Sequence, residues 1–218
     1  MTIFFGVKFK MQSSVISTVS YNQHEIIQNI IRLHLGGEPI ECDPTYSKGV
    51  FYKEGSGVTP PKLKFDLYPQ TQDTVKADCY SLPLESCTIS SIMYDPPFIA
   101  GHTGKKPTGL IGERFHGFPY VSDLWEFYDK SLSEFYRVLK PRGKLIVKCQ
   151  DTVSSGKQHL SHVHIIKQAE KLGFYTKDLF ILLAKTRLIG HNHKQQKHAR
   201  KFHSYFLVFE KCKTNGKS

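Results

Sequence analysis

The sequence predicts an α/β fold with a mostly parallel sheet, helices on both faces and an antiparallel edge strand. Short apolar runs typical of strands alternate with amphipathic helical patterns, and strands joined by helical crossovers run parallel. The run 179–184, LFILLA, is apolar throughout, as in a strand covered on both faces. The last two runs have no helical pattern between them, so we expect them to form an antiparallel pair at one edge of the sheet.

Each expected element follows from periodicity and from the turn residues that end it. Apolar stripes at helical spacing predict helices over 22–35, 122–139 and 159–172. Gly36 ends the first helix, and Ser122 is the expected N-cap of the second. Short apolar runs predict strands at 39–42, 62–67, 75–78, 89–94, 144–149, 179–184 and 205–209. The segment 46–61 has no clear period and receives no element.

Composition limits the classes of protein that this chain can belong to. With 39% hydrophobic and 22% charged residues among 218, it has an ordinary globular composition, which excludes disorder, collagen and coiled coil. No apolar run approaches the roughly 18 residues of a membrane span, and the first residues lack the order of a secretory signal. The five cysteines are scattered and never spaced as CxxC. We therefore expect one domain over 1–218, a cytoplasmic location and no metal.

The charge indicates a polyanionic partner. The formal net charge is +11, and two segments carry clustered cations. One is a Gly- and Pro-bearing stretch within 99–120, which we expect to be a mobile substrate loop. The other is the basic segment 185–203, in which aromatic and histidine residues alternate with cations. The residues expected to contact nucleic-acid phosphates are Lys105, Lys106, Arg114, Lys194, Lys197, Arg200 and Lys201.

Acidic residues follow successive expected strands, at the edge where open α/β sheets bind ligands. Each one alone is explained by the frequency of Asp in turns. Four together would crowd negative charge at one rim, which indicates a ligand with hydroxyl groups, amino groups or positive charge. These residues are Asp43, Asp66, Asp78 and Asp95.

The tetrapeptide Asp95-Pro96-Pro97-Phe98 follows the expected strand 89–94. It resembles the DPPY/DPPF motif of S-adenosylmethionine-dependent amino-methyltransferases, which modify exocyclic amino groups of nucleic-acid bases. The segment 41–49, ECDPTYSKG, resembles the first cofactor motif of that family, although the turn keeps only one glycine, Gly49. Residues 14–34 and 197–211 are similar to phage-type DNA methylases. The resemblance therefore covers most of the chain, and its specific parts are the DPPF and DPTY segments.

This resemblance implies a class I methyltransferase fold, which is Rossmann-like, and S-adenosylmethionine as cofactor. It places one group of residues at the methionine end of the cofactor, namely Asp43, Pro44, Tyr46 and Gly49. Asp66 is expected to accept hydrogen bonds from the ribose hydroxyls, and Asp78 from the adenine amino group, with Cys79 beside it. Asp95 is expected at the meeting point of cofactor and substrate.

The chemistry of the tetrapeptide can be argued from the residues themselves. An exocyclic amino nitrogen is a poor nucleophile because its lone pair is delocalised into the ring. The Asp95 carboxylate and the Pro96 carbonyl can accept its two hydrogens and direct the lone pair at the methyl donor. Pro97 stiffens this corner, and Phe98 offers a face on which the base can stack.

The resemblance implies methylation of adenine N6 in DNA, because the related cytosine-N4 enzymes more often carry serine where Asp95 stands. Methylation of an RNA base, methylation of cytosine N4 in DNA, and a non-catalytic nucleic-acid-binding subunit are the alternatives. DNA is the favoured partner over RNA, and the sequence does not indicate an oligomeric state.

Overall fold

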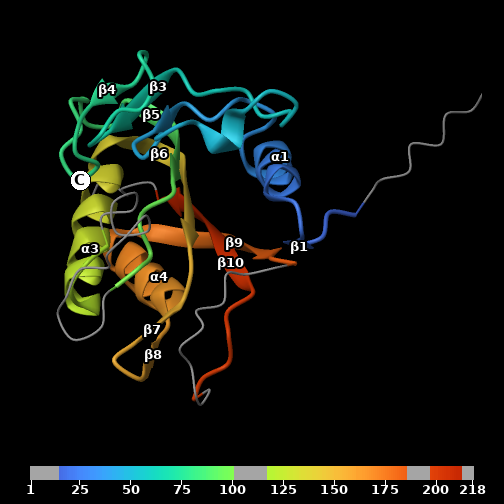
Figure 1. Ribbon diagram of the computed structural model, residues 1–218. Helices are drawn as coiled ribbons and strands as arrows, with labels where there is room; N and C mark the ends of the chain where they lie inside the picture. Colours follow the sequence, from blue (N-terminus) through green and yellow to red (C-terminus); the bar gives the residue numbers. More distant parts are fainter. Residues whose placement is uncertain (1–14, 101–116, 186–196, 213–218) are drawn as a thin grey trace, which may run out of the picture.

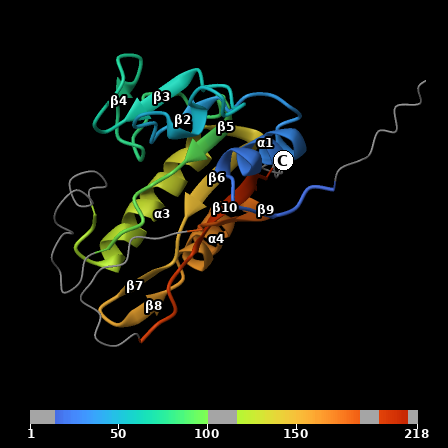
Figure 2. The same ribbon diagram turned by 45° about the vertical axis from the view of Figure 1, so that its right-hand side comes forward.

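The computed structural model describes residues 15–100, 117–185 and 197–212. Its main sheet has eight strands in the order β1-β9-β10-β6-β5-β2-β3-β4 (Figures 1 and 2). The strands are β1 (Val19–Ser20), β2 (Cys42–Asp43), β3 (Leu63–Asp66), β4 (Val75–Lys76), β5 (Ile89–Tyr94), β6 (Leu139–Cys149), β9 (Phe174–Leu183) and β10 (His203–Lys211). The pairs formed by β2, β3, β4, β5 and β6 are all parallel, and β10 runs antiparallel to both its neighbours.

Helices cover both faces of this sheet. They are α1 (Gln23–His34), α3 (Val121–Val138) and α4 (Ser161–Leu172), with a short 3-10 helix η1 (Val50–Tyr52) after β2. In Figure 1, α3 and α4 lie on one side of the sheet and α1 on the other. Two hydrophobic clusters follow this division: one packs α3 and α4 against the sheet, and the other packs α1 and η1. A separate antiparallel hairpin, β7 (Thr152–Ser154) and β8 (Lys157–His159), projects between β6 and α4.

The predicted α/β fold is confirmed, and the position of the antiparallel strand is corrected. We expected it at the edge, but β10 lies between β6 and β9. Its residues Phe206, Leu207, Val208 and Phe209 are all fully buried, and a strand buried on both faces must lie inside the sheet. The edge position beyond β9 is taken by β1, which pairs with it in parallel.

Several element boundaries also differ from the prediction. The second long helix begins at Val121, one residue earlier than expected, with Tyr120 rather than Ser122 as its N-cap. The backbone N–H of Tyr120 donates to Asp123 Oδ2 at 3.3 Å, so the capping carboxylate lies one residue after the predicted cap. The hairpin β7–β8, the strand β1 and the helix η1 are additions that were not predicted. Each is three residues or fewer per element, which is too short to show a period.

The topology brings the site to one edge of the sheet. The carboxyl ends of β2, β3, β5 and β6 share this edge because these strands are parallel. The amino end of β10 joins them because that strand is reversed. Among the helices of the described residues, none has the length and apolarity needed to cross a bilayer. The assignment of 1–218 to one methyltransferase domain stays a prediction.

Candidate active site

Asp95 lies directly after β5, where the two prolines take the chain out of the sheet. Its backbone N–H donates to Thr45 Oγ1 at 2.9 Å, and its Oδ2 accepts from Lys148 Nζ at 3.4 Å. Its other carboxylate oxygen, Oδ1, is buried and has no hydrogen-bond partner among the described residues. Burial raises the pKa of Asp95, and the charge of Lys148 lowers it. The structure therefore presents one unused acceptor at this position.

Pro96, Pro97 and Phe98 form the corner that follows. The Tyr128 hydroxyl on α3 donates to the Pro97 carbonyl at 2.9 Å, and Tyr128 itself is fully buried. This bond from α3 fixes the orientation of the corner. It also occupies the Pro97 carbonyl, which leaves the Pro96 carbonyl as the backbone acceptor expected to face a substrate.

Asp43 ends β2 and is buried, with 2% exposure. Its Oδ1 accepts from the Thr45 N–H at 2.9 Å and from Thr45 Oγ1 at 3.3 Å, and its Oδ2 accepts from the Tyr52 hydroxyl at 2.9 Å. Burial raises the pKa of Asp43 to about 7, and the charge of Asp95 adds to this effect. The Thr45 hydroxyl thus connects the two acidic residues, one from each of two adjacent strands.

The turn after β2 is built around Gly49 and Tyr46. Gly49 has a φ of +63°, in the left-handed region, and its N–H donates to the Tyr46 carbonyl at 2.8 Å. A Cβ at this position would meet the Tyr46 hydroxyl oxygen at 2.5 Å, so a larger residue would displace the Tyr46 ring as well as strain the left-handed backbone. The Tyr46 ring stacks on Tyr52, with ring centroids 5.5 Å apart. Pro44 is buried before this turn. The single glycine is therefore sufficient for the turn because an aromatic pair fills it.

Asp66, at the end of β3, holds the same turn from the next strand. Its Oδ2 accepts from the Ser47 N–H and its Oδ1 from the Tyr68 N–H, both at 2.8 Å. Each oxygen keeps a second lone pair, so the carboxylate can still accept from a ribose hydroxyl. The expected cofactor role of Asp66 stays a prediction, and its observed contacts are with backbone.

Asp78 and Cys79 follow β4 at the start of the connection to β5. Asp78 Oδ1 accepts from the Tyr80 N–H at 3.4 Å, a turn contact. Cys79 is 6% exposed, and its Sγ lies 3.4 Å from Ser131 Oγ on α3. Burial raises the pKa of Cys79 to about 12. The Cys79 side chain therefore faces the core, and a cofactor contact from this residue would have to come from its backbone.

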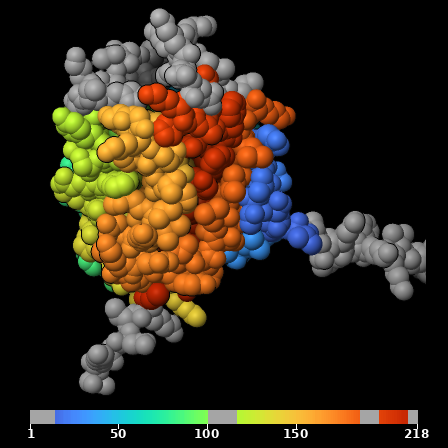
Figure 3. Space-filling model, turned by 90° about the horizontal axis from the view of Figure 1, so that it is seen from below, coloured from blue at the N-terminus to red at the C-terminus, as the bar shows by residue number. Residues whose placement is uncertain are grey.

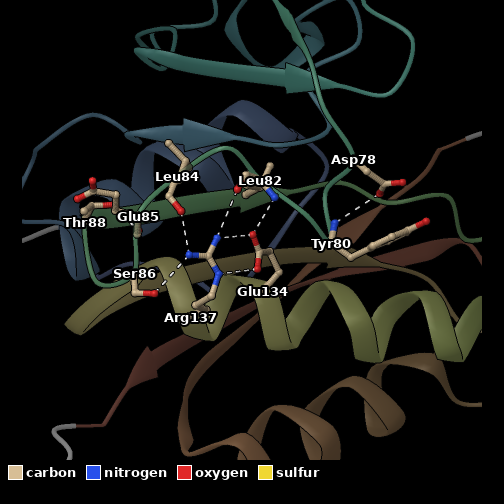
Figure 4. Close-up of polar contacts among 9 residues, drawn as sticks. All are labelled: Asp78, Tyr80, Leu82, Leu84, Glu85, Ser86, Thr88, Glu134 and Arg137. Carbon is tan, nitrogen blue, oxygen red and sulfur yellow. Dashed lines mark hydrogen bonds and ion pairs between the residues drawn. The ribbon is translucent and has the colours of Figure 1, made fainter.

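Two residues of α3, Glu134 and Arg137, bind the remaining backbone of the connection between β4 and β5, as Figure 4 shows. The Arg137 guanidinium donates to Glu134 through Nε at 2.8 Å and Nη2 at 2.6 Å, and to the Leu84 carbonyl at 2.8 Å. It also reaches the Leu82 carbonyl at 3.3 Å, while Glu134 Oε1 accepts from the Leu82 N–H at 2.7 Å. This paired arrangement fixes the backbone between Asp78 and β5.

An open cleft of about 520 Å³ borders the DPPF corner. Its lining comes from Phe98, from the end of β6 with Lys148, from the end of β9 and from the starts of α1 and β10. The lining residues are Tyr21, Asn22, Gln23, His24, Phe98, Lys148, Gln150, Leu182, Leu183, Ala184, Lys201, His203 and Ser204. The set contains two lysines and two histidines but no acid, so the cleft favours an anionic or electron-rich ligand.

The described part of the basic segment lies beside the hairpin β7–β8. His198 Nε2 is 2.8 Å from the Gly156 carbonyl in the hairpin turn. Figure 3 shows this side of the molecule, with the red residues after 197 against the light-orange hairpin and α4. Lys197 and Arg200 are exposed, and Lys201 lines the cleft. The other predicted phosphate contacts, Lys105, Lys106, Arg114 and Lys194, lie outside the described residues, as does most of the predicted loop 99–120.

The structure brings four residues to the site that the sequence analysis did not select. Thr45 and Tyr52 satisfy the buried Asp43, and Lys148 and Tyr128 contact the DPPF corner. A signal existed for Lys148, because it is a cation near the end of an apolar run that precedes an acid-rich edge. Thr45 lies within the DPTY segment. Tyr52 and Tyr128 had no recognisable signal.

The strand order and this edge define the class of protein. Taken from β4, the order is β4-β3-β2-β5-β6-β10-β9 with only β10 reversed within this series, which is the class I methyltransferase arrangement of the Rossmann-like α/β fold. The family model described as DNA methylase, N6_N4_Mtase, matches residues 89–217, which is more than half of the chain. The chain therefore belongs to this N6/N4 DNA methylase family.

Solved structures show lower similarity. The chain is similar to TrmN from Thermus thermophilus at 16% identity and a TM-score of 0.49, covering 86% of this chain and 48% of that one. A Thermus thermophilus protein assigned as a DNA modification methylase has 19% identity and a TM-score of 0.37, with 62% and 48% covered. The cytosine-N4-specific PvuII DNA methyltransferase has 16% identity and a TM-score of 0.41, with 61% and 45% covered.

The chain spans about half the length of these structures. Identity and TM-score are low in all three, so the assignment of the fold rests on the strand order of the chain itself. No curated protein matches the sequence significantly.

Proposed function

We propose that this chain transfers a methyl group from S-adenosylmethionine to the exocyclic amino nitrogen of a nucleobase, with adenine N6 in DNA as the target. The observation that carries the proposal is the buried Asp95 Oδ1, which has no partner among the described residues. It belongs to a rigid corner whose Phe98 lines a cleft of about 520 Å³. A volume of this size is typical of small-ligand sites and suffices for a base extruded from its strand.

The corner activates the amino group by accepting its hydrogens. Asp95 Oδ1 and the Pro96 carbonyl would each accept one N–H, so that the nitrogen lone pair is directed away from the ring. When bound, S-adenosylmethionine would supply a methyl carbon on a sulfonium sulfur: the N–C bond would form as the C–S bond breaks, the bonding pair would stay on sulfur, and the surplus N–H proton would be released to water. Phe98 would stack on the base, a contact worth about 1–3 kcal/mol.

The residues at the ends of β2 and β3 fit this cofactor. The buried Asp43 carboxylate and the half-buried Asp95 carboxylate repel one another, and the positive charge of a sulfonium cofactor would relieve that repulsion. Asp66 keeps lone pairs that suit ribose hydroxyls, and the turn of Tyr46 and Gly49 stands beside it. We assign Asp43, Pro44, Tyr46, Gly49 and Asp66 to cofactor binding, and Asp78 to the adenine amino group.

The partner nucleic acid would lie along the cleft and the hairpin. Lys157 in β8 is exposed, as are Lys197 and Arg200 of the neighbouring segment. Phe202, 39% exposed, lies among these cations, and its carbonyl accepts from the Ala184 N–H at 2.8 Å. Cations with an interleaved aromatic side chain are typical of surfaces that follow a phosphate backbone.

Labelled methyl transfer tests the proposal. The full chain is incubated with S-adenosylmethionine carrying a labelled methyl group and with DNA or RNA, and the product is digested to nucleosides. We expect label in N6-methyldeoxyadenosine. Label in N4-methyldeoxycytidine or in a methylated ribonucleoside would overturn the adenine or the DNA assignment. Absence of label, together with absence of cofactor binding by calorimetry, would indicate the non-catalytic subunit instead.

A further inference from the structure

Lys148 is the cation that faces Asp95. In the parallel pair β5–β6, Tyr94 is opposite Val147, so Asp95 and Lys148 are the next residues along their two strands. Lys148 Nζ lies 3.4 Å from Asp95 Oδ2, and the two side chains are 16% and 29% exposed. The lysine is also positioned by aromatic rings, because Nζ lies 4.9 Å from the Phe51 centroid and 5.9 Å from the Phe206 centroid. Three elements, β6, η1 and β10, therefore fix this ammonium group.

The other groups around Asp95 are acidic or neutral. Asp43 faces it from the end of β2, Cys149 follows Lys148 on β6, and Tyr128 approaches from α3. Burial raises the pKa of each of these three groups. Within the described residues, Lys148 is the cation that the structure places in contact with Asp95. Without this charge, the buried carboxyl would hold its proton to a higher pH.

We propose that Lys148 is a positioning residue for methyl transfer, which occupies Asp95 Oδ2 so that Oδ1 is the acceptor presented to the amino group. This inference rests on the proposed function and extends it. A carboxylate held at one oxygen keeps a single orientation, and its second oxygen then meets the substrate without reorganisation. A protonated carboxyl would offer a donor in place of one acceptor, and its remaining acceptor would polarise the amino N–H more weakly than a carboxylate does.

The pH dependence of turnover tests this role. Lys148→Met keeps an unbranched side chain between Phe51 and Phe206 but removes the charge. We expect the acidic limb of kcat to move up by about one pH unit or more, with a loss of about tenfold on the acidic side of that limb that recovers at higher pH. Lys148→Arg should restore most of the activity. Lys144→Met is the matched control, because Lys144 lies on the same strand and pairs with Glu210 at 3.0 Å.

Two outcomes would contradict the proposal. A uniform loss of kcat with an unmoved pH profile would make Lys148 merely structural. A rise in KM for the nucleic acid alone would make it a phosphate contact in the cleft.

Carboxyl titration by ¹³C NMR separates this inference from the proposed function. The Asp95 resonance is identified with Asp95→Asn and the Asp43 resonance with Asp43→Asn. We expect the Asp95 titration to move to higher pH in Lys148→Met and to stay in place in Lys144→Met, even if no substrate is methylated. An unchanged Asp95 titration would overturn the role of Lys148, whereas a displaced titration in a protein that methylates no nucleic acid would overturn only the proposed function.

Discussion

The two halves of the sheet hold their site residues by different means. The first half, β2, β3 and β4, consists of strands of two, four and two residues, and its acids lie in long connections. The second half contains β5, β6 and β10, with six, eleven and nine residues. In the second half the register of long strands sets Asp95 beside Lys148. In the first half, individual side-chain bonds to the backbone fix each loop.

This difference predicts how substitutions should act. In the long-strand half, the sheet survives the loss of one side chain, so a change there should affect chemistry and leave folding intact. In the short-strand half, one carboxylate holds several backbone groups, so a change there should affect stability and cofactor binding together.

The largest effect is expected from Asp95→Ala, in the long-strand half. Removing the acceptor should lower kcat by about 10³-fold, because the amino group loses the carboxylate that activates it. The affinity for S-adenosylmethionine should change little, since the sheet around Asp95 is unaltered. Methyl transfer and calorimetry measure the two quantities, with Asp73→Ala as an exposed-acid control. Retained turnover would refute the role of Asp95.

Asp43→Asn tests a residue at the boundary of the two halves, because Asp43 ends β2, which pairs with β5. Because burial raises the folded pKa of Asp43 to about 7, the ligand-free protein is destabilised as pH rises from the unfolded value of 3.8 through 7. The variant, which cannot ionise, should therefore gain up to about 4 kcal/mol over the native protein at pH 8 and unfold like it near pH 4. Denaturant unfolding at both pH values measures this gain. Equal free energies of unfolding for the variant and the native protein at pH 8 would mean that ionisation of Asp43 does not destabilise the folded state.

Asp66→Ala tests the short-strand half itself. Loss of the bonds to the Ser47 and Tyr68 N–H groups should cost about 1–2 kcal/mol and weaken cofactor binding about tenfold. Turnover at saturating cofactor should be retained, because Asp95 is untouched. Calorimetry and saturation kinetics separate these effects. A fall in kcat with unchanged affinity would place Asp66 with the chemistry and not with the cofactor turn.

The smallest effect is expected from Arg137→Lys. A lysine cannot reproduce the paired bonds to Glu134 and the bonds to the carbonyls of Leu82 and Leu84, so the connection to β5 should loosen at a cost of about 1–2 kcal/mol. Thermal unfolding measures this loss, and Arg32→Lys on the exposed side of α1 serves as the control. If both variants unfold alike, the clamp of Figure 4 does not contribute to stability.

Sequence reasoning located strands in both halves but missed some of their limits, since β6 was predicted at 144–149 and begins at Leu139. The strand Ile89–Tyr94 was predicted to the residue because apolar residues and two prolines mark both its limits. The predicted position of β10, at the edge of the sheet, was wrong, because a local pattern gives a strand's burial but not its neighbours. The acid positions at the strand ends were found because parallel strands share one edge.

The contacts that satisfy those acids could not be predicted. Asp43 is held by Tyr52, nine residues away in a segment with no period, and Pro97 is held by Tyr128 on a helix. Such contacts depend on tertiary packing, which no spacing in the sequence reports. The contact between Asp95 and Lys148 is an intermediate case, because it follows from the register of β5 and β6 once these two strands are known to be neighbours.

The interior position of β10 has a consequence for how the protein is made. During synthesis, β6 and β9 leave the ribosome before β10 and cannot pair with each other in the final arrangement. The apolar edges of β6 and β9 that pair with β10 therefore stay unpaired until residues 203–211 have been synthesised. Completion of the sheet depends on its last-synthesised strand, and nascent chains that stop before it should be the ones that chaperones bind and proteases remove.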